Sequence, residues 1–304
     1  MAGMPAIESG DIRVRTVMAG SLWLDGGAMF GVVPRILWSR RAHADERNRI
    51  QLAMRCLLIE TPSATILVDT GLGNKEDARF LDIYGVSNVG DPTRLESSLL
   101  DLGVEPQQVD VVVNTHLHFD HAGGNTVRRP DGRIEPAFPN AEYAIQRGEW
   151  EYAQLDNERV QASYVADNFM PLEADGRIRW LDGERETIVP GVEVVRTPGH
   201  TPYHQSVLLT VGDHRLFYLA DLVPTVAHLP LPWIMGYDVE PLTTLESKRH
   251  WIGRAVAEGW LLGFEHDPAV AWGTASASDR PGRAELIDVV DDPVNAPGPT
   301  EEEV

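Results

Sequence analysis

The 304-residue sequence predicts a single α/β domain. Short runs rich in valine, isoleucine and leucine, which are typical of buried strands, alternate along the chain with segments of helical composition. Histidine and aspartate residues follow several of these runs between positions 69 and 266, so this whole interval is expected to fold together. Hydrophobic residues make up 43% of the chain and charged residues 24%, which is enough apolar material for a sizeable core.

The N-terminal third is expected to contain strands followed by two helices. Residues 51–69 form a hairpin around the Thr-Pro-Ser turn at 61–63, and the start signals at 91–93 and the stop at Gly103 bound the second helix. The strands are predicted at residues 12–19, 21–24, 51–60 and 64–69, and the helices at 75–84 and 93–102.

Two apolar segments do not match any regular element. Residues 29–38 are interrupted by Gly31 and Pro34 and follow neither the helical nor the strand period, so we interpret them as a loop. The charged residues 40–49 after it are expected to be solvated. Residues 223–237 are long, proline-rich and apolar, and therefore cannot be regular throughout.

Residues 114–124 carry three histidines and one aspartate within six positions: His116, His118, Asp120 and His121. The β-branched run at 109–113 predicts a buried strand, so the cluster lies on a turn at its carboxyl end. Alternation along an extended segment would place His116, His118 and Asp120 on one side and His121 elsewhere. This one segment could therefore bind two ions. His116 and His118 would bind the first ion, and Asp120 and His121 would bind the second. Imidazole and carboxylate groups bind borderline divalent ions, and four at this spacing favour a catalytic metal site over a surface accident.

The rest of the chain is expected to supply more strands and three helices. Residues 126–138 are predicted to be an exposed hairpin or loop. The strands are predicted at residues 142–145, 177–181, 187–189, 192–196, 206–211, 215–219 and 260–264, and the helices at 147–154, 158–168 and 241–259. We expect the domain to cover residues 1–290 and the acidic residues 291–304 to be a disordered tail.

Three further ligand-type residues each follow a predicted strand. They are His200 in Pro-Gly-His-Thr-Pro, Asp221 at the end of an apolar run, and His266 at the end of another. Together with His-x-His-x-Asp-His at 116–121, they occur in the order typical of the metallo-β-lactamase superfamily, which this chain resembles over most of its length.

The resemblance implies an αββα sandwich of two mixed β-sheets flanked by helices. It also implies two metal sites that share Asp221 as a bridging carboxylate. The first would comprise His116, His118, His200 and Asp221, and the second Asp120, His121, Asp221 and His266. Asp69 resembles the family's acid that orients the ligands, and it also suits a turn-capping role before Gly71.

The implied chemistry is hydrolysis by a hydroxide shared between two divalent ions, with Asp221 bridging them and Asp120 passing a proton to the leaving group. Zinc is expected first, although manganese, iron or cobalt would accept the same ligands. The ligand spacing resembles that of the N-acyl homoserine lactonases and of the methyl parathion hydrolase type. We therefore predict a hydrolase that acts on small apolar esters, and first of all a lactonase. The alternatives are a phosphotriesterase or arylesterase, and a catalytically idle binding or scaffold protein.

The resemblance departs at one position and leaves the substrate contacts open. Lactonases of this family commonly carry a tyrosine where this chain has Pro224, and Tyr237 or Tyr203 could replace it. An N-terminal loop often forms an apolar substrate wall in such enzymes, which suggests this role for Met29, Phe30 and Trp38; a dimer contact and core packing are equal alternatives. A second wall is predicted from Trp233, Ile234, Met235 and Tyr237, whereas His228 is interpreted as an ordinary loop histidine.

The charge and composition of the chain limit the classes of molecule that it is expected to bind. A formal charge of −20 argues against nucleic acid, because such binding depends on neutralising phosphates. The single cysteine, Cys56, lies in an apolar run and excludes an intrachain disulfide. The start of the sequence does not resemble a signal peptide, and no apolar run has the length of a membrane helix. We therefore expect a cytoplasmic enzyme that does not bind membranes. Its expected partner is a small ester or lactone substrate, and it could form a homodimer.

Overall fold

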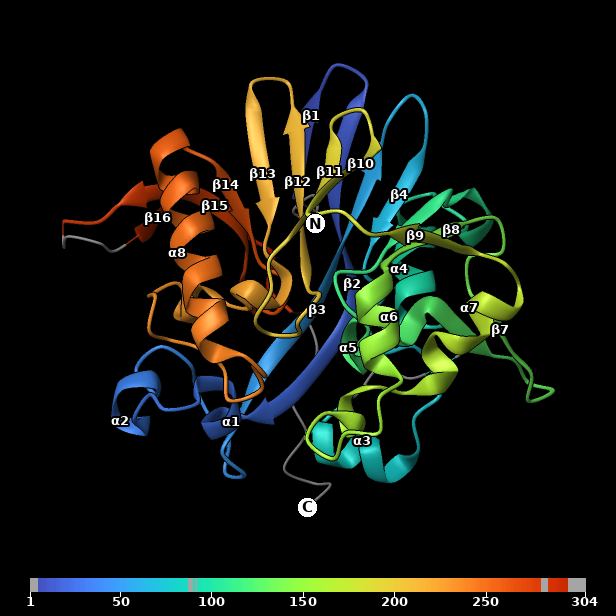
Figure 1. The fold of residues 1–304 in the computed structure, drawn as a ribbon, viewed down its shortest axis with the longest axis horizontal. Helices are drawn as coiled ribbons and strands as arrows, with labels where there is room; N and C mark the ends of the chain where they lie inside the picture. The colour runs from blue at the N-terminus through green and yellow to red at the C-terminus, as the bar shows by residue number, and fades with distance from the viewer. Residues whose placement is uncertain (1–4, 87–89, 91, 280–283, 295–304) are drawn as a thin grey trace.

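The computed structural model describes residues 5–86, 90, 92–279 and 284–294, and two large mixed sheets dominate it (Figure 1). The first sheet has seven strands in the order β1-β2-β3-β4-β5-β8-β9. These strands are β1 (Ala6–Ser9), β2 (Ile12–Asp25), β3 (Arg49–Glu60), β4 (Thr65–Val68), β5 (Val111–Val113), β8 (Glu142–Gln146) and β9 (Ile178–Leu181).

The second sheet also has seven strands, paired in sequence order. These are β10 (Arg185–Val189), β11 (Val192–Arg196), β12 (Gln205–Val211), β13 (His214–Tyr218), β14 (Leu261–Gly263), β15 (Val270–Ala277) and β16 (Ala284–Asp291). A small separate hairpin pairs β6 (Thr126–Arg128) with β7 (Ile134–Pro136). The helices are α1 (Gly26–Phe30), α2 (Arg35–Trp38), α3 (Ala78–Tyr84), α4 (Arg94–Asp101), α5 (Phe119–Ala122), α6 (Arg147–Ala153), α7 (Met170–Ala174) and α8 (Pro241–Glu258).

Three buried clusters define the layers. One lies between the sheets, where Ile59 and Val113 of the first sheet share a core with Val207 of the second. Another covers the outer face of the first sheet and includes Leu99 of α4. The third packs α8 on the outer face of the second sheet. This is the predicted αββα sandwich, with both parallel and antiparallel pairs in each sheet, so the fold prediction is confirmed.

Parallel pairing explains why the predicted ligands converge. β4, β5 and β8 run parallel in the first sheet, and β13 and β14 run parallel in the second. The segments that follow β4, β5, β13 and β14 therefore leave their sheets at the same edge. These segments contain Asp69, the cluster at 116–121, Asp221 and His266.

Several elements differ from the prediction. Residues 29–38 are mostly two short helices, because the Asp25 side chain caps α1 by accepting a hydrogen bond from Ala28 N (2.8 Å) and Pro34 precedes α2. The helix predicted at 158–168 is wrong. That stretch forms two 3₁₀ turns, since Asn157 Oδ1 accepts from Arg159 N (3.0 Å) and the β-branched Val160 and Val165 disfavour a helix.

The C-terminal boundary also lies later than predicted. β15 and β16 were not expected as strands, and β16 reaches Asp291. The fully buried Arg55 then donates to Asp292 Oδ2 (3.0 Å) and to the Asp292 carbonyl (2.5 Å). The same guanidinium donates to the carbonyls of Phe264 and Asp267, which lie on either side of His266. Residues 291–294 thus belong to the domain, and residues 295–304 of the predicted tail lie outside the described part of the chain.

Within the described residues, no helix is both long enough and apolar enough to pass through a bilayer.

Candidate metal centre

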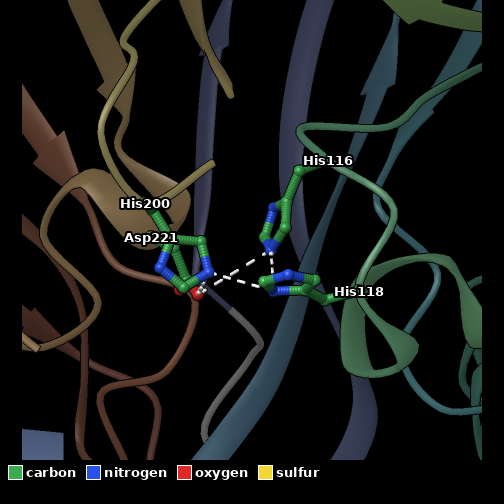
Figure 2. Close-up of side chains that lie close together, drawn as sticks. All are labelled: His116, His118, His200 and Asp221. Carbon is green, nitrogen blue, oxygen red and sulfur yellow. Dashed lines mark hydrogen bonds and ion pairs between the residues drawn. The ribbon is translucent and has the colours of Figure 1, made fainter. Parts of the chain in front are cut away.

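The first predicted ligand set comes together at the edge where the two sheets meet. His118 Nδ1 lies 3.0 Å from His116 Nε2 and 3.0 Å from His200 Nε2. Asp221 Oδ2 is 3.0 Å from His200 Nε2 and 3.9 Å from His116 Nε2, and Figure 2 shows the four side chains pointing toward one another. Four ligands about 2.0 Å from a tetrahedral Zn²⁺ lie roughly 3.3 Å apart, so this spacing fits such an ion.

The second predicted set lies on the other side of Asp221. His121 Nε2 and His266 Nε2 are 3.0 Å apart, and Asp120 lies 4.0 Å from His121 and 3.8 Å from His266. Asp221 is 3.2 Å from His266 and 3.6 Å from His121, so its carboxylate contacts both sets. Asp120 and His121 both belong to the single turn of α5. The alternation predicted for this segment is therefore wrong, although the two expected groups of ligands form.

The chemistry of these clusters fits divalent cations. All seven side chains are buried. Asp221 Oδ1 has no hydrogen-bond partner in the described part of the chain. Pairs of imidazole nitrogens only 3.0 Å apart aim their lone pairs at a common point, which a cation would stabilise. The two clusters could therefore hold divalent metal ions.

Backbone groups and side chains behind the ligands fix their orientation. His116 Nδ1 lies 3.1 Å from Thr115 Oγ1, His200 Nδ1 lies 3.0 Å from Asp238 Oδ1, and His266 Nδ1 lies 2.7 Å from the Ala53 carbonyl. Each contact occupies Nδ1 and leaves Nε2 facing the centre.

Asp69 supports the turn that carries the histidine cluster. It accepts hydrogen bonds from Thr115 N (2.8 Å) and Thr115 Oγ1 (2.7 Å), and its Oδ2 lies 3.1 Å from His121 Nδ1. The φ angle is +57° at Asp69 and +45° at Ala220, the residue before Asp221. Such angles are uncommon outside glycine, and strained backbone of this kind concentrates at functional sites.

Burial and charge shift the pKa values in opposite directions across the centre. Burial, reinforced by the other histidines, holds the pKa values of His116 and His118 well below 6.5. Burial also opposes the charged form of His200 and His266, but Asp221 outweighs it and raises their pKa values to about 10 and about 9. For His121, the carboxylates of Glu265 and Asp221 outweigh burial and raise the pKa. These values describe the metal-free protein.

Sequence reasoning missed three acidic residues at the site. Asp238 is buried against His200, and Glu265 Oε2 lies 3.1 Å from His121 Nδ1. Glu149 accepts hydrogen bonds from Leu117 N (3.1 Å), Tyr164 Oη (2.9 Å) and Thr201 Oγ1 (2.6 Å), and so joins the cluster at 116–121 to the loop of His200. Glu265 offered a signal, because an acidic residue directly after an apolar strand and beside a predicted ligand is unusual. Asp238 and Glu149 offered none.

A fourth missed residue, His204, positions the shared carboxylate. His204 Nε2 accepts a hydrogen bond from Asp221 N (3.2 Å), and its Nδ1 lies 2.8 Å from Thr197 Oγ1. Burial lowers the pKa of His204 to about 3, so the ring is neutral and can accept this bond.

The first predicted substrate wall lies in the core. Met29, Phe30 and Trp38 are 1%, 0% and 2% exposed, and the Phe30 ring stacks on Trp38 and on His228, with centroids 5.1 and 4.5 Å apart. Core packing, one of the three alternatives, therefore describes their contacts in this structure, and the substrate-wall role stays a prediction. His228 is structural: its Nε2 lies 2.8 Å from the Met29 carbonyl. The dimer contact, the remaining alternative for this segment, also stays a prediction.

The second predicted wall keeps accessible surface. Trp233 and Ile234 are partly buried, Met235 is buried, and Tyr237 is 37% exposed. Burial raises the pKa of Tyr237, and the charges of Tyr84, Asp25 and Asp120 raise it further. Tyr203 instead packs beneath the Arg196 guanidinium, 4.9 Å from its ring centroid. A substrate contact stays a prediction for both tyrosines.

Comparison with known proteins decides the family. The family model described as the metallo-β-lactamase superfamily matches residues 54–257, which is most of the chain. The chain belongs to the metallo-β-lactamase superfamily. The predicted superfamily membership is therefore confirmed.

Individual relatives of this superfamily member are lactonases and hydrolases. An N-acyl homoserine lactonase from Bacillus sp. is 34% identical over 167 residues, which cover 53% of this chain and 59% of that protein. The match thus spans less than two thirds of that relative's length. A crystal structure of a probable metal-dependent hydrolase from Staphylococcus aureus superposes with a TM-score of 0.83 at 28% identity, covering 93% of this chain and all of that one. AidC, a dizinc quorum-quenching lactonase, shares the fold at 20% identity, with a TM-score of 0.76 over 94% of this chain and 97% of its own.

Proposed function

We propose that this protein is a dinuclear metal-dependent hydrolase that opens the ring of acyl lactones. The observation that carries the proposal is the position of Asp221, 3.0 Å from His200 in one ligand set and 3.2 Å from His266 in the other. The similarity to the N-acyl homoserine lactonase from Bacillus sp. supports lactones as the substrate class. Zinc is the ion we propose first, since the donors are imidazole nitrogens and carboxylate oxygens.

Divalent ions, when bound there, supply an activated water and polarise the substrate carbonyl. The chain's own residues do the rest. Asp120 is the most loosely held acid of the second set, at 3.8 and 4.0 Å from the nearest imidazole nitrogens. Its carboxylate is therefore free to take a proton and pass it to the ring oxygen that leaves. The Tyr237 hydroxyl, which belongs to the second predicted wall and is partly accessible, would donate a hydrogen bond to the substrate.

A phosphotriesterase or arylesterase is the second candidate. Pro224 occupies the position where lactonases of this superfamily commonly carry a tyrosine, and its carbonyl accepts a hydrogen bond from His266 N (3.1 Å). The partly buried Trp233 and Ile234 would suit an apolar leaving group equally well. A catalytically idle role is disfavoured because the predicted ligand set is complete.

The test is metal analysis combined with a hydrolysis panel of acyl lactones, aryl esters and phosphotriesters. We expect about two Zn²⁺ per chain and highest activity on lactones. With Zn²⁺ in excess, Asp120→Asn should lower kcat by about 10²-fold because the proton transfer is lost, whereas the exposed Asp101→Asn should match wild type. Hydrolysis of phosphotriesters but not of lactones would favour the second candidate. If no ester were hydrolysed, the catalytically idle role would be favoured.

A further inference from the structure

Glu265 is a buried acid that the proposed reaction does not use. It follows β14 directly, precedes His266, and is 0% exposed. Its backbone is fixed to the neighbouring sheet, because Arg55 N donates to the Glu265 carbonyl (3.2 Å). Neither carboxylate oxygen has a hydrogen-bond partner in the described part of the chain, and the Tyr218 hydroxyl donates to the Arg55 carbonyl instead.

The carboxylate of Glu265 makes its closest ionic contact with His121. Glu265 Oε2 lies 3.1 Å from His121 Nδ1, the same distance that separates this nitrogen from Asp69 Oδ2. Two carboxylates therefore face one imidazole nitrogen. The other ligand histidines differ: Nδ1 of His116 faces a hydroxyl and Nδ1 of His266 faces a carbonyl. His200 has one carboxylate, from Asp238.

The division of work between the two acids follows from their other partners. Asp69 already accepts two hydrogen bonds from Thr115 and so ties His121 to the turn before it. Glu265 accepts no hydrogen bond in the described part of the chain, so its carboxylate is left to face the imidazole. A carboxylate behind a ligating histidine fixes the ring and makes the opposite nitrogen a stronger donor.

We propose that Glu265 is a positioning residue: together with Asp69 it fixes His121 and selectively strengthens the second ligand set for its ion. This inference rests on the proposed dinuclear function, because it assigns Glu265 to one of the two proposed ions. The first set should be indifferent to Glu265, since its histidines have other supports.

The experiment compares Glu265→Gln with Glu96→Gln. Glu96 is equally a buried acid, at 7% exposed, but it closes the capping box of α4, a role that glutamine also fills. Metal-free proteins are titrated with Zn²⁺ against a chromophoric chelator, and with Co²⁺ while its visible absorption is recorded. We expect Glu265→Gln to weaken the second dissociation constant about 10- to 100-fold and to leave the first unchanged. Glu96→Gln should leave both unchanged.

Hydrolysis gives a second readout. Excess Zn²⁺ should restore the kcat of Glu265→Gln, because the missing contribution is metal affinity. Unchanged second-site affinity, or an equal loss at both sites, would overturn the proposal. If wild type binds only one ion, the dinuclear function itself fails, which is a different outcome. If Glu265→Gln does not fold, Glu265→Asp replaces it, because the shorter side chain withdraws the carboxylate from His121 and is expected to weaken binding of the same ion. Failure of both variants to fold in excess Zn²⁺ would show that Glu265 is structural and would overturn its positioning role.

Discussion

The two ligand sets share Asp221 but are prepared for a metal ion in different ways. In the first set, His116 and His118 are neutral in the metal-free protein because burial lowers their pKa values. In the second set, His121 and His266 have raised pKa values because carboxylates surround them. The first set is therefore largely ready to bind, whereas the second must release protons first. The difference suggests that the first site fills before the second at neutral pH.

The largest effect should come from the residue common to both sets. Asp221→Asn removes a charge that contacts His200 and His266, and we expect hydrolysis to fall by about 10³-fold, equivalent to several kcal/mol. Bound Zn²⁺, measured by elemental analysis after gel filtration, should fall at both sites. Retention of one full equivalent would show that Asp221 serves only one set.

The next effect is the pH dependence of metal affinity. His121 and His266 must both lose a proton, so the affinity of the second site should rise by up to about 100-fold per pH unit near neutrality. For the first site only His200, with a pKa of about 10, is protonated, so the rise should be about tenfold per unit. Calorimetry in buffers of different ionisation enthalpy counts the released protons. Equal proton release at the two sites would contradict the comparison.

The same groups link pH to the stability of the metal-free protein. The folded pKa values of His200 and His266, about 10 and about 9, exceed the ordinary value of 6.5. Their stabilising contribution is thus complete below pH 6.5 and is lost as the pH rises through 9 to 10. Thermal melting after EDTA treatment should show a falling Tm over this range, and Zn²⁺-loaded protein should not show this loss.

A smaller change should separate the sets. Asp238→Asn weakens the support of His200, whose Nδ1 lies 3.0 Å from the carboxylate, so we expect about a 10- to 100-fold loss of affinity at the first site. The second site should keep its affinity, which is the reverse of the result expected for Glu265→Gln. The chelator competition used for Glu265 measures both constants.

The smallest effect concerns a residue outside both sets. Tyr237→Phe removes one hydroxyl from the second predicted wall, and loss of one hydrogen bond to the substrate should lower kcat/KM by about tenfold. Both metal affinities should stay at the wild-type values. An unchanged kcat/KM for every substrate would remove Tyr237 from the substrate site.

Local sequence patterns predicted most of the strands and singled out the seven ligand-type residues, because both depend on short-range signals. The order of elements that carry Asp69, Asp221 and His266 then placed these side chains at one edge. Grouping within the cluster was harder, since one turn of helix at α5 replaced the extended backbone that alternation assumes. That the seven side chains bind metal stays a proposal.

Supports and walls could not be predicted because they depend on contacts distant in sequence. Asp238 lies 38 residues from His200 along the chain, and nothing local to Asp238 points to that contact. For Phe30 the sequence left a substrate wall, a dimer contact and core packing equally open, because only the folded chain shows its ring stacked between Trp38 and His228. The sequence did not predict β15 because Gly273 and small polar residues weaken the strand pattern.

The contact between Arg55 and Asp292 sets a limit on how far the protein can be shortened. Arg55 has no access to solvent, and its guanidinium reaches both the carbonyls flanking His266 and the C-terminal segment. Trimming the chain at residue 290 would leave an arginine charge without its counter-ion directly behind one of the proposed ligands. A truncation that removes the acidic C-terminal residues should therefore end at Val294. A shorter chain is expected to hold the edge that carries the proposed ligands less firmly.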